Sequence, residues 1–373
     1  MKDTVLQKLP DPFLNGDGTR VKTPEEWYEK RKEIMALVTD IEYGKMPPEP
    51  EVFGFETCNA GNGIQVHTCL ITAGIKKRQL SFELRLYRPK NEGRLPVVLT
   101  GDGCYRTMTD EVIAEINARG FIAAVFDRTV IVRNVYDKVE VRNSPLYRVY
   151  PEIESGSLAG WAWGFLRCVD ALVQMPFVDA GNIAVTGHSR GGKTALLAAA
   201  ADERIAFSAP NGSGGGGTTV WRFGMSGYDG PDYQDARSEN LAGMLDSIPH
   251  WLGPKMNEYR DKEQLLPFDQ HYLEALVAPR CLLHTEGYGD IWSNPKGSHQ
   301  ALMAAKEVYK FLGVPENIVS RYRPGVHDHK PEDFRALLDL MEAKNTGKPL
   351  DKKFYENPYP DMEPAFDWRC PGD

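Results

Sequence analysis

The amino-acid sequence predicts an α/β protein in which a mostly parallel sheet carries helices on both of its faces. From about residue 80, short runs of β-branched and apolar residues alternate with longer runs of helical periodicity. Parallel strands need helical crossovers of this kind, so the alternation indicates the fold class. The chain has 373 residues, of which 42% are hydrophobic, and it is therefore long enough to bury the large core that this architecture requires.

The expected elements follow one another in a regular order. Runs with the length and composition of strands lie at residues 80–87, 95–101, 121–127, 183–188, 205–210, 281–287 and 319–324. Between them, apolar residues at helical spacing predict helices at 110–120, 158–175 and 298–313. The first and last of these helices end at a glycine, which commonly terminates a helix.

We expect residues 1–373 to form a single domain with two less regular segments. Residues 1–55 are rich in proline and charge, and we expect them to wrap over the sheet. Residues 211–266 begin with NGSGGGGTTVWRF and are predicted to be a loop-rich insertion that forms one wall of a cleft. The aromatic side chains expected in this wall are Trp221, Tyr228, Tyr233 and Trp251.

Composition excludes several classes of protein. A net charge of -8 argues against a surface that binds nucleic acid or anionic lipid. The six cysteines are scattered without a CxxC pair, so the sequence indicates neither a zinc site nor a disulfide framework. The first residues lack the apolar core of a signal peptide, and no run approaches the roughly 20 apolar residues of a membrane span. We therefore expect a soluble, cytoplasmic protein, although a secreted chain trimmed of its leader would look the same.

The stretch VTGHSRGGKTALLAAA, at residues 185–200, contains a serine in the pattern G-x-S-x-G. A β-branched run precedes the pattern and a helix-forming run follows it. In this context the turn lifts a nucleophilic serine above the sheet of an α/β-hydrolase. The alternative is a glycine-rich turn that binds a phosphate at the helix N-terminus. The flanking strand and helix favour Ser189 as a nucleophile.

Two cations follow the serine in the first turn of the expected helix. Arg190 and Lys193 oppose the helix dipole there, at a cost of a few tenths of a kcal/mol each. An oxyanion that develops beside Ser189 would favour both, because donors aimed at such a charge stabilise it strongly. The alternative for Lys193 is a solvated lysine on the surface.

A general base is expected late in the chain, because α/β-hydrolases carry their serine, acid and histidine in that order. His299 falls inside the predicted helix 298–313. In contrast, RPGVHDH places His327 and His329 in a loop after the last predicted strand. We prefer His327 as the base and keep His329 as the alternative.

Several motifs together resemble the glucuronoyl esterases, a carbohydrate esterase family of α/β-hydrolases that cleave esters of 4-O-methyl-glucuronic acid. The likeness extends from roughly residue 40 to residue 344. Its motifs are YGKMPPEP, GWAWGFLRCVDAL, TGHSRGGKTAL, SGGGGTTVWR, LPFDQHYLEALVAPR, GDIWSNP and PGVHDH. In combination they are far more specific than any one of them.

The resemblance implies roles for individual residues. Ser189 would be the nucleophile, and Arg190 would complete the oxyanion hole with its side chain and backbone N–H. Lys193 would donate to sugar hydroxyls, and Glu239 and Trp292 would contact the uronate. Trp292 would stack on the pyranose face, as aromatic rings do on apolar C–H surfaces. Considered alone, Trp292 is as readily a core residue, and Glu239 a solvated glutamate at a helix start.

The chain departs from the family pattern at two positions. Many members carry the triad acid as a glutamate where this chain has Gly212, and a cysteine where it has His188. Either the protein has lost catalysis or the acid has moved. HTEGYGDIW offers Asp290 after a predicted strand, with Glu286 as the weaker candidate. Asp290 has the alternative of capping its own glycine-rich turn.

We therefore expect a serine ester hydrolase in which Ser189 attacks, His327 transfers the proton, Asp290 orients the imidazole and Arg190 stabilises the oxyanion. No cofactor or metal is expected. The expected partner is a small-molecule or oligosaccharide uronate ester. Two other functions stay open. One is a carboxylesterase for another acyl group, such as an acetylated sugar or a lactone, and the other is a carbohydrate-binding protein without turnover.

Overall fold

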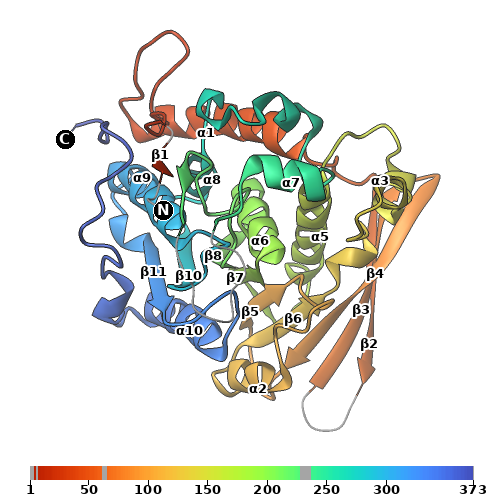
Figure 1. Ribbon diagram of the computed structural model, residues 1–373. Coiled ribbons are helices and arrows are strands. Elements are labelled where there is room, and N and C mark those ends of the chain that lie inside the picture. Colours follow the sequence, from red (N-terminus) through yellow and green to blue (C-terminus); the bar gives the residue numbers. More distant parts are fainter. Residues whose placement is uncertain (1–3, 6, 61–64, 227–236, 373) are drawn as a thin grey trace.

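A nine-stranded sheet forms the centre of the molecule (Figure 1). The computed structural model describes residues 4–5, 7–60, 65–226 and 237–372. The strands follow the order β11-β10-β8-β7-β5-β6-β4-β3-β2. The neighbours from β11 to β6 pair in parallel, whereas β4, β3 and β2 are added antiparallel at one edge. This is the α/β architecture that the sequence predicted.

Every strand expected from the sequence is present, and the structure adds two more at the antiparallel edge. The strands missed are β2 and β3; in β3 exposed and buried side chains alternate, as in Leu70 and Ile71, whereas the described side chains of β2 are partly or fully exposed. The strand bounds are β2 Val52–Ala60, β3 Gln65–Ile75, β4 Arg78–Arg88, β5 Leu95–Thr100, β6 Ile122–Phe126, β7 Val178–His188, β8 Ile205–Asn211, β10 Cys281–Gly287 and β11 Ile318–Arg323. A separate small sheet pairs β1 (Thr4–Val5) with β9 (Phe223–Gly224).

Helices cover both faces of the sheet and enclose two hydrophobic clusters. One face carries α5 (Ser157–Leu172), α6 (Arg190–Ala201), α8 (Gln270–Ala275) and α9 (Pro295–Phe311). The other face carries α2 (Asp110–Ala118) and α10 (Pro331–Thr346). The remaining α-helices are α1 (Pro24–Val38), α3 (Lys138–Arg142), α4 (Pro145–Val149) and α7 (Leu241–Ser247). In the part of the chain that the structure describes, no helix has both the length and the apolar character needed to cross a membrane.

The first 55 residues connect distant parts of the molecule. Trp27 of α1 is fully buried, and the Arg31 Nε donates to the Leu276 carbonyl just after α8, at 3.0 Å. A π-helical turn, Thr39–Tyr43, follows α1, and β2 joins the sheet edge from Val52. The Leu9 amide donates to Ala365 at 2.8 Å, so the segment before α1 lies against the last residues of the chain (Figure 1).

The segment 211–266 leaves the sheet at the end of β8. Trp221 and Trp251, two of the aromatic residues expected in a cleft wall, are buried. Trp251 packs edge-on against Trp161 of α5, with ring centroids 6.0 Å apart. The other two, Tyr228 and Tyr233, lie outside the described residues. The described part of this segment is thus packed onto the helical layer.

Candidate active site

Ser189 lies at the sharp turn between β7 and α6. Its backbone has φ 54° and ψ -122°, a conformation that residues other than glycine rarely adopt. Such strain persists only where surrounding contacts hold it, and it is concentrated at functional sites. Here the Ser189 amide donates to the Asn211 carbonyl at 2.9 Å. The turn therefore presents the serine at the carboxyl edge of the sheet, as the pattern predicted.

The buried carboxylate of Asp102 holds this turn by a hydrogen bond to its backbone. Asp102, which follows β5, accepts from the His188 amide through Oδ2 at 2.7 Å and forms an ion pair with Arg128. Both ionic side chains are almost completely buried. The backbone of Gly191 passes so close that a Cβ there would collide with the Asp102 carboxylate. The second glycine of G-x-S-x-G is thus required by this close approach.

The same turn matches a second motif, because GHSRGGKT at residues 187–194 has the spacing G-x-x-x-x-G-K-[ST] of a phosphate-binding loop. The structure argues against that function. Phosphate loops offer free backbone N–H groups, but the amides of His188 and Ser189 already donate to Asp102 and Asn211. Lys193 is buried and donates to protein acceptors. The nucleophile interpretation is the one that the geometry favours.

His327 and Asp290 meet at the same edge of the sheet. They follow the neighbouring parallel strands β11 and β10, and the His327 Nδ1 lies 2.7 Å from the Asp290 Oδ2. Asp290 is almost fully buried, and its Oδ1 accepts from the Ser293 amide at 3.1 Å. Burial alone would raise the pKa of Asp290, but the hydrogen bonds from His327 and Ser293 outweigh burial and hold the pKa below its ordinary value. Asp290 is therefore a carboxylate that stays charged beside the imidazole.

Position 212 lies close to both Asp290 and His327. Gly212 has a φ of +45°, and a Cβ on it would lie 3.1 Å from the Asp290 Oδ2 and 3.5 Å from the His327 Nδ1. Side chains from positions 212 and 290 would thus converge on one imidazole nitrogen. The aspartate fills the space that a side chain at 212 would otherwise enter.

The alternative residues have other surroundings. Glu286 is fully buried on β10, and its Oε1 accepts from the Thr218 Oγ1 at 3.4 Å. Burial, and secondarily the Asp290 charge, raises the pKa of Glu286 well above its usual value. His329 packs its ring on Phe334, with centroids 4.1 Å apart, and burial lowers its pKa well below the ordinary value. His299 lies inside α9, as expected.

Arg190 lies beside the serine, against two aromatic rings. Its guanidinium carbon is 4.8 Å from the centroid of the Trp251 ring, and its NH1 donates to the Tyr105 hydroxyl at 3.2 Å. Tyr105 belongs to the loop after β5, the same loop that carries Asp102. These contacts hold a cation next to Ser189, where it could stabilise negative charge that develops beside that serine.

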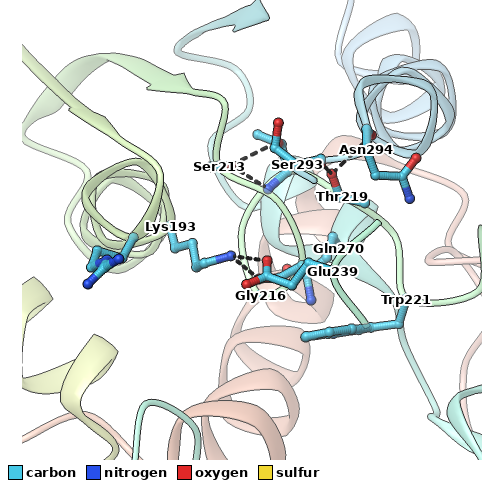
Figure 2. A network of polar contacts seen from close by, with 12 residues as sticks. Lys193, Ser213, Gly216, Thr219, Trp221, Glu239, Gln270, Ser293 and Asn294 are labelled. Atoms are coloured by element: carbon cyan, nitrogen blue, oxygen red, sulfur yellow. Dashed lines mark hydrogen bonds and ion pairs between the residues drawn. The ribbon is translucent and has the colours of Figure 1, made fainter. Parts of the chain in front are cut away.

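Lys193 and Glu239 form a buried ion pair (Figure 2), and Trp292 is joined to this pair through its backbone carbonyl. The Lys193 Nζ lies 2.7 Å from the Glu239 Oε2 and 2.5 Å from the Gly215 carbonyl. Both side chains of this ion pair are buried, and burial lowers the pKa of Lys193 although Glu239 opposes that shift. The Glu239 amide donates to the carbonyl of Trp292, whose side chain remains 38% exposed. The structure thus brings the three expected sugar-contacting residues together.

Several polar residues around this group were not predicted from the sequence. Glu42, in the π-helical turn, accepts from the Gln270 Nε2 at 2.7 and 2.9 Å and from the Trp221 Nε1 at 3.1 Å. Burial raises the pKa of Glu42 to about 8. Asn211 and Asp102 were missed as well. No local spacing marks these residues, because each acts through partners far away in the chain.

The combination of groups fits acyl transfer: a strained serine, an imidazole held by a buried carboxylate, and a neighbouring cation. Comparisons with known proteins agree. The family model described as "Glucuronyl esterase, fungi" matches residues 71–313. The chain belongs to the glucuronoyl esterase family. As a member of this family it is a carboxylic ester hydrolase with an α/β-hydrolase fold, which confirms the resemblance noted in the sequence.

Individual members of the glucuronoyl esterase family are similar along most of the chain. The 4-O-methyl-glucuronoyl methylesterase 1 of Wolfiporia cocos is 31% identical over 314 residues, which cover 83% of this chain and 73% of that protein. A carbohydrate esterase family 15 glucuronoyl esterase from Caldicellulosiruptor kristjansonii superimposes with a TM-score of 0.83 at 30% identity, covering 98% and 97% of the two chains. A promiscuous esterase of the same family, from a marine bacterial metagenome, gives a TM-score of 0.78 at 26% identity and covers 91% and 97%.

Proposed function

We propose that this protein hydrolyses esters of glucuronic acid or 4-O-methyl-glucuronic acid, with Ser189, His327 and Asp290 as its catalytic triad. The observation that carries the proposal is the 2.7 Å contact between the His327 Nδ1 and the Asp290 Oδ2 at the edge of the sheet that presents Ser189. The names of relatives such as the Wolfiporia cocos enzyme support the choice of substrate. The substrate is thus a small molecule or an oligosaccharide that carries a uronate ester.

Catalysis then proceeds in two acyl-transfer steps. The Ser189 Oγ attacks the ester carbonyl while its proton moves to the Nε2 of His327, the nitrogen left available by the Nδ1 contact with Asp290. Arg190 stabilises the resulting oxyanion. The carbon–oxygen bond to the alcohol breaks, and His327 returns the proton to the departing oxygen. Water then attacks the acyl-enzyme by the same route and releases the uronate.

The Lys193–Glu239 pair and Trp292 provide recognition of the sugar. The buried ammonium of Lys193 has three donors, of which Gly215 and Glu239 take two in the free protein. One donor therefore remains for a sugar oxygen, and the Glu239 carboxylate offers an acceptor for a hydroxyl. The exposed ring of Trp292 is available to stack on the apolar face of the sugar.

Substrate comparison tests this function directly. Values of kcat/KM are measured for methyl and benzyl glucuronate and for p-nitrophenyl acetate, with Ser189→Ala as the control for background hydrolysis. We expect the glucuronates to be preferred, and Ser189→Ala to lose on the order of 10⁴-fold or more in rate. Dominant turnover of the acetate would refute the uronate assignment.

A second candidate is a carboxylesterase for other acyl groups, such as acetylated sugars or lactones. It is favoured by the similarity to an esterase that is described as promiscuous. Labelling with a fluorophosphonate probe separates both enzymes from a binding protein without turnover, since only an activated serine reacts. We expect wild-type protein to be labelled and Ser189→Ala to be inert.

A further inference from the structure

Ring contacts lead from the proposed base, His327, into the protein: the His188 ring is tilted by 44° to the His327 ring and stacked, at 29°, on the His329 ring. The ring of His188, the residue before the nucleophile, has its centroid 4.4 Å from that of His327 and 6.0 Å from that of His329. His329 in turn stacks on Phe334 of α10 at 4.1 Å. His188 is thus packed between the proposed base and a ring anchored on a helix. A movement of the His188 ring would therefore change its contact with the His327 ring.

Hydrogen bonds fix the orientation of His188. The Asn211 Nδ2 donates to the carbonyl and the hydroxyl of Thr285, at 3.1 and 2.9 Å, so the Asn211 Oδ1 faces His188 as an acceptor. The His188 Nδ1 lies 2.6 Å from this oxygen and must therefore carry the proton. The His188 amide is also held, by Asp102. Both the ring and the backbone of His188 are therefore fixed from separate elements.

The surroundings of His188 favour its neutral form. Burial, and then the neighbouring His327, lowers the pKa of His188 to about 4, while Asn211, Asp290 and Asp328 act in the opposite direction. A neutral ring adds no positive charge next to an imidazole that becomes cationic during catalysis. The ring can therefore support His327 throughout the reaction.

Gly212 leaves room for this ring contact. Position 212 has no side chain, and the His188 Cε1 lies 3.6 Å from where a Cβ at 212 would be. We propose that His188 is a positioning residue whose ring, packed between His327 and His329, fixes the orientation of His327 toward Ser189. This inference rests on the proposed function in assigning His327 as the base.

Two substitutions separate the ring from the hydrogen bond. His188→Asn keeps a donor for Asn211 but removes the ring, and His188→Phe keeps a flat ring but removes the donor. We expect His188→Asn to lower kcat by about 10- to 100-fold, the scale of a misplaced catalytic group, with KM unchanged. We expect His188→Phe to keep kcat within about threefold while it lowers the melting temperature, because the buried Asn211 Oδ1 loses its partner.

The matched control is His67→Phe. His67 on β3 is also buried and stacked on an aromatic ring, with its centroid 5.3 Å from that of Phe177, but it lies away from the site residues. We expect its kcat to equal that of the wild type. If His188→Asn keeps the full rate while His188→Phe loses it, His188 acts only through Asn211 and the inference is wrong. The inference is also wrong if His188→Asn raises KM instead of lowering kcat, or if neither His188 variant differs from the wild type in kcat.

A second readout keeps this test independent of the substrate. The rate of fluorophosphonate labelling reports the activation of Ser189 whatever acyl group the enzyme prefers. We expect labelling of His188→Asn to slow by the same factor as kcat, and labelling of His188→Phe to stay near the wild-type rate. If wild-type protein is labelled but cleaves no glucuronate, the proposed substrate fails, and the labelling rates still decide the role of His188.

Discussion

At the scale of single residues, the acid of the proposed triad is the feature most open to test. We expect Asp290→Asn to preserve the fold and to lower the rate on a glucuronate ester by roughly 10³- to 10⁴-fold, because an amide neither fixes the required tautomer nor stabilises the imidazolium. Steady-state kinetics measure the effect. Glu286→Gln is the control, since its hydrogen bond is with Thr218, and it should retain most of the activity. An active Asp290→Asn would remove this aspartate from the mechanism.

The Lys193–Glu239 ion pair gives a prediction about specificity. We expect Glu239→Gln to raise KM for methyl glucuronate while it changes turnover of p-nitrophenyl acetate much less, because the small acetate has no sugar to contact. Lys193→Ala should show the same selectivity with a larger loss of stability, since it leaves Glu239 buried without its cation. Equal losses on both substrates would mean that the pair supports the fold and not the sugar.

At the scale of elements, the connection between β5 and the turn after β7 decides how firmly Ser189 is held. The Asp102–Arg128 pair is buried, and the Asp102 Oδ2 also accepts from the His188 amide. We expect Arg128→Met to destabilise the protein by about 3–5 kcal/mol, because Asp102 remains as an unpaired buried charge. Urea denaturation measures the change. Arg335→Met, which removes an exposed pair with Glu115, is the control and should have a much smaller effect.

Sequence patterns predicted the inner parallel strands well and the outer elements poorly. The strand at 281–287 has the predicted bounds, because the apolar residues that begin it follow Pro279 and its end is marked by Gly287 and Gly289. The strands β2 and β3 were missed, since one of their faces is polar and Gly54 and Cys58 interrupt the pattern of β2. The helix α1 was missed because an unbroken charged run, residues 29–33, lies at its centre, and only Trp27, Ile34 and Val38 are buried.

The site shows a similar division. Ser189, Asp290 and His327 were predictable because each follows a strand at the carboxyl edge of a parallel sheet, where motif order limits the choices. Asp102 and Asn211 were not, since their roles come from contacts across the sheet with His188, 86 and 23 residues away in the chain. Pairing between strands is what creates these contacts, and a local pattern does not record it.

At the scale of the whole molecule, Glu42 links the N-terminal region to Gln270 and Trp221, far along the chain. Burial raises the pKa of Glu42 in the folded protein to about 8, above the ordinary glutamate pKa of 4.5, so between these pH values the folded protein binds more protons at this group than the unfolded chain does. Stability from this group is therefore fully present below about pH 4.5 and is lost as pH rises through about 8. We expect Glu42→Gln to remove this loss.

Melting temperatures between pH 5 and pH 8 test the linkage. The wild type should lose stability over this range more steeply than Glu42→Gln, whose amide stays neutral. The substituted amide also gains an acceptor, because the Gln270 Oε1 has no hydrogen-bond partner among the described residues. Asp246→Asn is the control, since Asp246 is an exposed partner of Arg260 and should leave this slope unchanged. Parallel curves for Glu42→Gln and the wild type would contradict the assignment.

The convergence of positions 212 and 290 on one imidazole has an evolutionary consequence. A Cβ at Gly212 would lie 3.1 Å from the Asp290 Oδ2, so the two loops compete for the same place beside His327. A descendant with carboxylates at both positions would hold two like charges in contact, and one of them would keep its proton. With the proposed triad, such a protein would keep one carboxylate beside His327 whichever of the two positions later changed. The acid could then move from one loop to the other with no inactive form in between, while Ser189 and His327 stayed in place.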